Sequence, residues 1–159
     1  MHPMLNTAVK AARDAAEIIQ YGARNLDRLT VESKAPGDFV SEIDRNAEAA
    51  IVDTLLGAYP NHGIIAEEGS GATRGNPNAS HIWIIDPLDG TTNFLHGFPT
   101  YCVSIALQVE GKLTQAVIYD PNRNDLFTAS RGAGAFMNNR RVRVSKALKL
   151  RECLIGTGF

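Results

Sequence analysis

Apolar residues near the start of the chain recur at steps of three and four, which is typical of an amphipathic helix. The repeat predicts a helix over about residues 3 to 25. Its apolar positions are Leu5, Val9, Ala12, Ala16 and Ile19. A second helix is predicted to begin after Ser41 as N-cap, with Asp44 at the third helical position, and to end at Tyr59-Pro60. We therefore expect two helices in this part of the chain.

The remainder of the chain has the short, evenly spaced apolar segments that are typical of β-strands. Residues 29–33 and 64–68 predict two early strands. Later strands are predicted over residues 101–110, 113–119, 126–130, 134–137, 141–145 and 153–155. Such a closely spaced series, separated by turn residues, predicts an antiparallel meander. Helices followed by strands indicate an α+β fold in which a helix pair covers one face of an antiparallel sheet.

The second face of the predicted sheet is not strongly polar. Strand alternation points Val103 and Ile105 to one face and Cys102, Ala106 and Gln108 to the other. We therefore expect part of the second face to pack on something outside this chain.

Composition narrows the class of protein. The chain has 159 residues and is 44% hydrophobic, which suits a single domain with a proper core. Sixteen basic and seventeen acidic residues give a net charge of -1, so bulk charge favours neither nucleic acid nor an anionic membrane. No apolar run indicates a signal peptide or a membrane span, and we expect a cytoplasmic protein. Cys102 and Cys153 have no metal-binding spacing and are expected to be packed, reduced thiols.

Four acidic side chains lie at predicted strand ends between residues 67 and 91. Glu67 and Glu68 end one predicted strand, and alternation sends them to opposite faces. Asp86 and Asp89 follow a buried apolar run, and the Asp-Pro pair predicts a type I turn that would hold the two Asp Cα atoms within about 7 Å. Each piece alone is explained by an ordinary turn or a solvated strand end. Together they place carboxylates beside apolar segments, where unpaired charges are costly.

Oxygen ligands without a Cys or His cluster select hard cations, and Mg²⁺ commonly takes one or two carboxylates plus a substrate phosphate. Phosphatases use two such ions about 3.5 to 4 Å apart, and Asp86 is the natural bridging carboxylate. Gly90 would let a ligand approach the backbone, and residues 91–93 are predicted to open a short helix whose N–H groups accept phosphate oxygens. The stretch therefore predicts a metal-dependent phosphate site.

The segment from Trp83 to Phe94, preceded by Ala66-Glu67-Glu68, resembles the signature of the inositol monophosphatase family of metal-dependent, lithium-sensitive phosphatases. Residues 1–6 resemble the opening of the family's bacterial SuhB-like branch, the extragenic suppressor proteins. Further matching blocks occupy residues 37–44, 98–99, 117–121 and 131–136. The resemblance implies that residues 1–159 form the amino-terminal α+β half of the family fold, and that the carboxy-terminal α/β half of the family is absent from this chain.

This resemblance also implies Mg²⁺-dependent hydrolysis of inositol 1-phosphate and similar small phosphate monoesters. Glu67, Asp86 and the Leu88 carbonyl would bind the first Mg²⁺, and Asp86 with Asp89 would bind the second. Family members complete the second site with an Asp from the carboxy-terminal half, for which no downstream residue here substitutes.

Other matching positions receive roles around these metals. Glu67 and Thr91 would orient and deprotonate the attacking water, and Asp44 would lie behind the site. Gly90, Thr91 and Thr92 would hold the substrate phosphate. A mobile loop that closes near the metals would carry Lys34 and Asp38.

A second, non-catalytic interpretation follows from the same resemblance. Bacterial relatives also act with RNA polymerase and the transcription antitermination machinery, which would make the chain a protein- or RNA-binding module. The local basic cluster spans residues 140–146. Its simpler interpretation is a strand with Val142 and Val144 facing inward and Arg141 and Arg143 in solvent. Relatives also form homodimers, so a homodimer is expected.

Overall fold

The computed structural model describes residues 2–35, 38–69 and 74–156, and the side chains of residues 32–40 also lie outside the described part. Its helices are α1 (Pro3–Ala23), α2 (Glu42–Ala58) and α3 (Thr91–Leu95), with 3-10 turns at Leu26–Arg28 and Leu150–Glu152. Its strands are β1 (Val31–Ala35), β2 (Asp38–Ser41), β3 (Gly63–Ala66), β4 (His81–Asp89), β5 (Cys102–Val109), β6 (Lys112–Asp120), β7 (Asp125–Ser130), β8 (Gly134–Met137) and β9 (Arg140–Val142).

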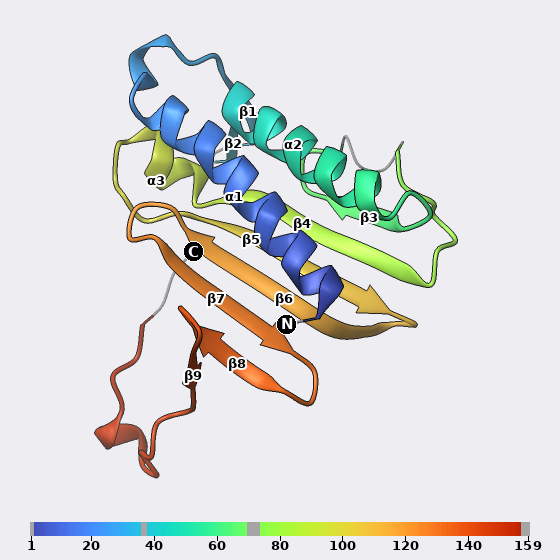
Figure 1. Ribbon diagram of the computed structural model, residues 1–159. Helices are drawn as coiled ribbons and strands as arrows, with labels where there is room; N and C mark the ends of the chain where they lie inside the picture. Colours follow the sequence, from blue (N-terminus) through green and yellow to red (C-terminus); the bar gives the residue numbers. More distant parts are fainter. Residues whose placement is uncertain (1, 36–37, 70–73, 157–159) are drawn as a thin grey trace.

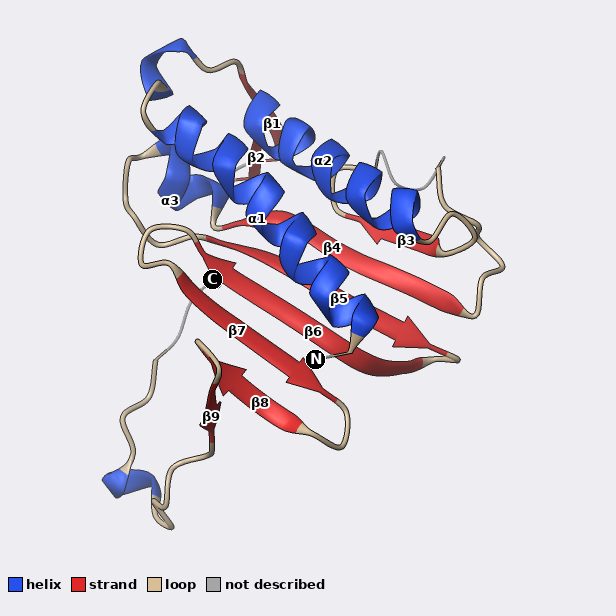
Figure 2. Cartoon of the chain, viewed as in Figure 1, coloured by secondary structure: helices blue, strands red, loops and turns tan. Residues whose placement is uncertain are grey.

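Helices α1 and α2 lie side by side on one face of a seven-stranded sheet with the strand order β3-β4-β5-β6-β7-β8-β9 (Figures 1 and 2). Strands β1 and β2 form a separate antiparallel hairpin. The predicted α+β architecture and the antiparallel meander from β5 onward are confirmed. One pair differs, because β3 and β4 are parallel. Parallel neighbours need a long connection, which the polar segment between them provides.

The two long helices begin as their sequences predict. Pro3 stands at the first position of α1, and the imidazole of His2 accepts a hydrogen bond from the Met4 N–H at 3.3 Å. Ser41 and Asp44 form the predicted capping box at the start of α2. The buried stripe of α1 consists mainly of small residues, which let α2 and the sheet approach closely: Ala8, Ala11, Ala12, Ala15 and Ala16.

Three predicted strands are corrected by the structure. The early strand at 29–33 is displaced to Val31–Ala35, where it pairs with β2. β9 ends at Val142, and Val144 is 93% exposed rather than inward-facing. Residues 153–155 form no strand, and Leu154 is fully exposed. A strand needs hydrogen-bonding partners, and the described part of the chain offers none beyond β9.

Strand β4 also differs from the prediction, because it continues through Asp86-Pro87 to Asp89 instead of ending in a type I turn. Asp86 pairs with Ser104 and Asp89 with Cys102, so β4 contains one more residue than β5 between these pairs. This irregularity is a bulge, which is where a sheet tolerates proline. The two Asp residues therefore belong to one bulged strand.

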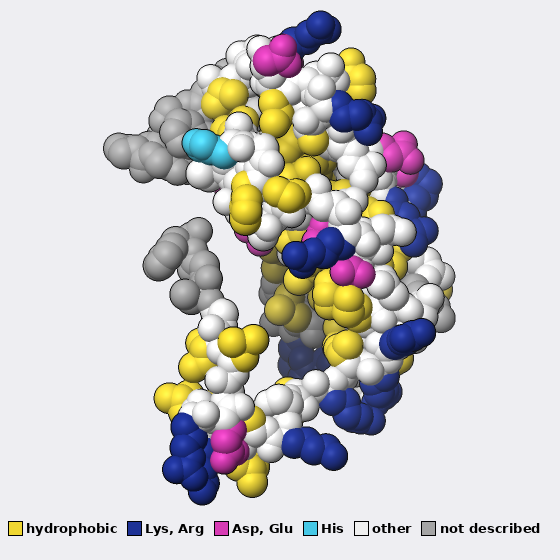
Figure 3. All heavy atoms as spheres, turned by 90° about the vertical axis from the view of Figure 1, so that its left-hand side faces the viewer, with side chains coloured by type: hydrophobic (Ala, Val, Ile, Leu, Met, Phe, Trp, Pro, Cys, Tyr) yellow, Lys and Arg dark blue, Asp and Glu magenta, His cyan; other side chains and the backbone are white. Residues whose placement is uncertain are grey.

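The sheet face opposite the helices is apolar and open. One row of cross-strand neighbours consists of Ile65, Ile84, Ala106, Ala116, Ala129, Ala135 and Val142. On the same face Ile65 is 55% exposed and Ile118 is 44% exposed. Figure 3 shows hydrophobic side chains on the hollowed side of the molecule. We refer to this surface as the open face. None of the described helices combines the length and apolar character that crossing a membrane requires.

Candidate active site

Asp44 lies at the start of α2 and is almost completely buried. One of its carboxylate oxygens accepts hydrogen bonds from the Ser41 N–H at 2.8 Å and from the Ser41 hydroxyl at 2.5 Å. The other accepts a hydrogen bond from the Thr91 hydroxyl at 2.8 Å. The Thr91 oxygen is also 3.0 Å from the Leu88 carbonyl oxygen. A helix cap therefore connects α2 to the bulged end of β4.

Glu67 and Glu68 form a turn directly after β3. The Glu67 N–H donates to the Ile85 carbonyl at 3.3 Å, which continues the β3–β4 pairing by one residue. The Glu68 N–H donates to a carboxylate oxygen of Glu48 at 2.7 Å. Glu48 is fully buried in α2, one turn after Asp44. Sequence reasoning missed Glu48, although its position on the buried stripe of the helix is a signal for it.

The carboxyl group of Asp86 lies among the other acids of the stretch. Burial is the main factor that raises its pKa to about 7, and the charge of Glu67 and a side-chain hydrogen bond with Glu67 act in the same direction. The charge of Asp89 raises it further, whereas the Leu88 N–H, 3.2 Å from the carboxylate, lowers it. The structure therefore brings Glu67, Asp86 and Asp89 together, with an excess of negative charge.

Gly90 makes the sharp exit from β4 into α3. Its φ is +99°, and a Cβ at this position would lie 2.9 Å from the Thr100 carbonyl oxygen. Only glycine adopts this conformation in this space without strain. The predicted short helix follows over Thr91–Leu95, and the Thr92 carbonyl accepts a hydrogen bond from the His96 N–H at 3.2 Å. Thr91 contacts the Asp44 carboxylate, and Thr92 follows it in α3.

The two residues assigned to a mobile loop lie in the β1–β2 hairpin. The backbone of Lys34 belongs to β1 and that of Asp38 to β2, two strands that pair with each other. Their side chains and residues 36–37 lie outside the described part. The mobility of this segment and the role of both side chains stay predictions.

The cysteines depart from the expected packed thiols. Cys153 is exposed, because the segment after β9 leaves the sheet. Cys102 is partly buried on the open face, with its sulfur 3.8 Å from a carboxylate oxygen of Asp89. Burial and the nearby Asp89 charge raise the pKa of the Cys102 thiol to about 12, so this cysteine stays protonated.

The donor set agrees in kind with the predicted Mg²⁺. Carboxylates and a backbone carbonyl are the ligands that hard cations prefer. The raised pKa of Asp86 reflects its burial first and then the neighbouring negative charge, which a cation would balance. Within the described residues, however, no three His, Cys, Asp or Glu side chains are arranged around one point that a metal ion would occupy. The types of ligand atom therefore suit Mg²⁺, but the described residues do not supply a complete set of ligands.

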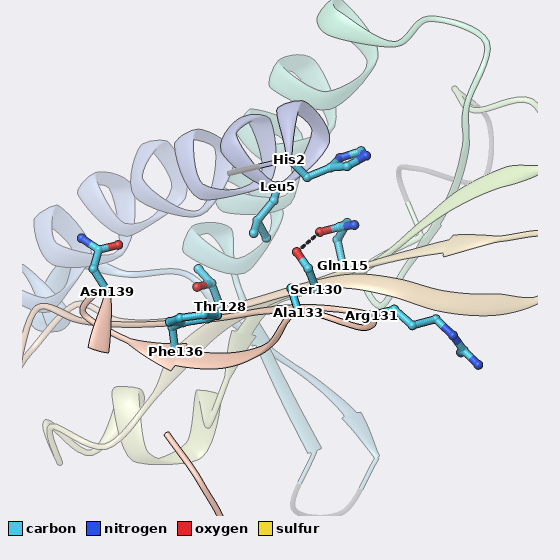
Figure 4. Close-up of a pocket in the computed structure, with 9 residues that line it drawn as sticks. All are labelled: His2, Leu5, Gln115, Thr128, Ser130, Arg131, Ala133, Phe136 and Asn139. Carbon is cyan, nitrogen blue, oxygen red and sulfur yellow. Dashed lines mark hydrogen bonds between the residues drawn. The ribbon is translucent and has the colours of Figure 1, made fainter. Parts of the chain in front are cut away.

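A separate cavity of about 600 Å³ lies between the start of α1 and strands β6 to β8 (Figure 4). Leu5 and Phe136 supply apolar walls, and on its floor Ser130 donates a hydrogen bond to Gln115. None of the predicted site residues lines it. The acidic site and this cavity are thus distinct places on the helix-and-sheet scaffold.

The family model of the inositol monophosphatase family matches residues 1–159. The chain belongs to the inositol monophosphatase family. Nus factor SuhB of Pseudomonas aeruginosa is 50% identical over all of this chain, which covers 59% of that protein. This inositol monophosphatase family chain therefore spans about 60% of the length of the curated relatives it matches.

Two solved structures of the family have the same fold. The extragenic suppressor protein suhB from Bartonella henselae is 44% identical with a TM-score of 0.87, over 92% of this chain and 56% of that one. A Thermotoga maritima IMPase is 36% identical with a TM-score of 0.80, over 89% of this chain and 54% of that one. The resemblance of residues 83–94 to the family, and that of residues 1–6 to its SuhB-like branch, is thereby confirmed.

Proposed function

We propose that the chain is the amino-terminal part of a Mg²⁺-dependent phosphatase that hydrolyses inositol 1-phosphate and related small phosphate monoesters. The observation that carries the proposal is the approach of Glu67 and Asp89 to Asp86, next to Thr91. Family membership supports the reaction class. The proposal includes a carboxy-terminal α/β half that completes the second metal site.

Glu67, Asp86, the Leu88 carbonyl and Asp89 would hold the Mg²⁺ ions. When bound, Mg²⁺ supplies charge neutralisation and the activation of water. The ligand set supplied by the described residues is incomplete.

Asp44 and Thr91 form the orienting pair in this proposal. The Thr91 hydroxyl donates a hydrogen bond to Asp44. A lone pair of the Thr91 oxygen is therefore left to accept a hydrogen bond from the attacking water. Glu67 would accept the second proton of that water as general base. The backbone N–H groups at Gly90, Thr91 and Thr92 would bind the phosphate oxygens. Lys34 and Asp38, in the β1–β2 hairpin, keep their proposed place near the metals.

The test is a phosphate-release assay on inositol 1-phosphate, with and without Mg²⁺ and Li⁺. It compares the verified 159-residue chain with the chain extended to the length of its relatives. We expect Mg²⁺-dependent, Li⁺-sensitive release from the extended protein and little from the shorter one. No release from the extended protein would contradict the phosphatase proposal. Robust, Li⁺-sensitive turnover by the 159-residue chain would show that the second half is not needed.

A second proposed function is a role in transcription antitermination, which the name Nus factor SuhB of the relatives favours. The basic residues after β8 would then contact RNA. Arg141 is partly engaged, because its guanidinium donates to the Ala133 carbonyl at 2.6 Å and lies 5.3 Å from the centre of the Phe136 ring. Arg143 lies beyond the end of β9 and is exposed.

RNA binding at several salt concentrations tests this second function. We expect binding that weakens steeply with salt and is lost when Arg141→Ala and Arg143→Ala are combined. Arg13→Ala combined with Arg24→Ala removes the same amount of charge from exposed positions on and directly after α1, and this control should bind as the unmodified chain does. Salt-insensitive or absent binding would contradict the RNA-binding role.

A further inference from the structure

Helix α2 carries two buried carboxylates that contact the two separate segments of the acidic site. Asp44 and Glu48 are four residues apart and therefore lie on the same side of the helix. Asp44 holds the Thr91 hydroxyl after β4, and Glu48 holds the Glu68 N–H after β3. One helix thus makes contact with both segments that supply acidic side chains.

Glu48 is an unusual residue for its position. It is 0% exposed, in a stripe that, apart from Asp44, buries apolar residues such as Ala47 and Ile51. A carboxylate taken out of water is costly unless its hydrogen bonds compensate for the lost hydration. The 2.7 Å bond from the Glu68 N–H is one such bond, and it reaches the residue directly after Glu67.

The turn that carries Glu67 is held from two sides. The Glu67 N–H is bound to the Ile85 carbonyl, directly before Asp86, and the Glu68 N–H is bound to Glu48. The first bond fixes the turn along β4, and the second fixes it against α2. With both in place, the Glu67 carboxylate has little freedom to move away from Asp86.

We propose that Glu48 is a positioning residue that anchors the Glu67–Glu68 turn to α2 and thereby sets the Glu67 carboxylate beside Asp86. The inference rests on the proposed function, because it assigns Glu48 to the same Mg²⁺ site. Groups that orient metal ligands in this way commonly affect metal affinity by 10- to 100-fold.

Three variants separate positioning from a merely structural role. Glu48→Met keeps the length of the side chain but has no acceptor oxygen for the Glu68 N–H. Glu48→Gln keeps an acceptor oxygen for the Glu68 N–H. Asp53→Asn removes one charge from an exposed position of the same helix and is the matched control.

The measurements are the midpoint of thermal unfolding, hydrogen exchange at the Glu68 amide and Mg²⁺ affinity by titration calorimetry, all on the whole chain. For Glu48→Met we expect a folded protein, exchange at Glu68 accelerated by about 100-fold or more while Ile51 stays protected, and Mg²⁺ affinity lowered by about 10-fold or more. In Glu48→Gln, the exchange rate of the Glu68 amide and the Mg²⁺ affinity should both be close to those of the unmodified chain. Asp53→Asn should match the unmodified chain.

Glu48→Met with unchanged Mg²⁺ affinity, or with a Glu68 amide that stays protected, would overturn the proposal. A parallel loss in Asp53→Asn would show a general charge effect and would overturn it as well. Absence of Mg²⁺ binding by the unmodified chain would count against the proposed function instead. The exchange at Glu68 would then still decide whether Glu48 anchors the turn.

Discussion

Burial and neighbouring negative charge both raise the pKa of the Asp86 carboxyl group. Its pKa rises from about 4 in the unfolded chain to about 7 in the folded, metal-free protein. The folded state therefore binds a proton more tightly between these two values, and the contribution of Asp86 to stability is present at low pH and lost as the pH rises to about 7.

We expect Asp86→Asn to raise the thermal unfolding midpoint of the metal-free chain at pH 8 and to change it little at pH 4. The amide cannot ionise, so the cost of burying a charge and the repulsion from Glu67 and Asp89 are both removed at high pH. Thermal unfolding in a chelating buffer at both pH values measures the effect. An equal shift at pH 4 and pH 8 would contradict this origin.

Gly90 supplies a second prediction for a single residue. Gly90→Ala should lower the free energy of unfolding by about 2 kcal/mol, because the alanine would be forced to a positive φ and its Cβ would press on the Thr100 carbonyl. Denaturant unfolding measures this. Gly57→Ala in α2 is the control, because an added Cβ there would meet nothing within 4 Å outside the local helix backbone, and it should be neutral or stabilising by about 0.5 to 1 kcal/mol. Equal effects of both changes would refute the argument.

Elements whose signals are local are predictable from the sequence. The capping box of α2 depends on residues three positions apart, and the ends of both long helices follow from His2, Pro3 and Tyr59. The course of β4 through Pro87 depends instead on pairing with β5, which no local pattern contains. The fold class was therefore predictable, whereas this bulge was not.

The candidate site, like the fold, is only partly predictable from the sequence. Glu67, Asp86 and Asp89 can be recognised as candidate site residues in the sequence because they follow apolar runs. The bond between Thr91 and Asp44 joins residues 47 positions apart and appears only in the folded chain. Glu48 was overlooked because a single Glu in a helix is usually solvated, and only its burial sets it apart.

At the scale of an element, Ser41→Ala tests the start of α2. We expect the free energy of unfolding to fall by about 1 kcal/mol, because the Ile43 N–H loses its side-chain acceptor and Asp44 loses a hydroxyl donor. Denaturant unfolding measures the change, and Ser80→Ala in the polar segment before β4 is the control. An unchanged midpoint for Ser41→Ala would show that the cap adds nothing to stability.

The whole molecule has a helical layer on one side of the sheet (Figure 1), and the other side is the apolar open face. Exposed apolar patches of this kind favour association. We therefore expect the 159-residue chain to self-associate, as a homodimer or a larger species, through the open face.

Sedimentation velocity at several concentrations measures this association. Ile118→Lys, on the open face, should raise the concentration needed for association by about 10-fold, since a charge would be buried in the contact. Tyr21→Lys, at an exposed position of α1, is the control and should associate as the unmodified chain does. A monomer at every concentration would refute the prediction.

The parallel pairing of β3 with β4 has a consequence for the order of folding. Strands β5 to β8 join neighbours through short hairpin connections, which close quickly. Strand β3 meets β4 only after the whole segment between Ala66 and His81 has been closed into a loop, which is slower because more chain entropy is lost. We therefore expect the meander to form first and the acidic side chains to converge late, when a finished core is already present to restrain their repulsion.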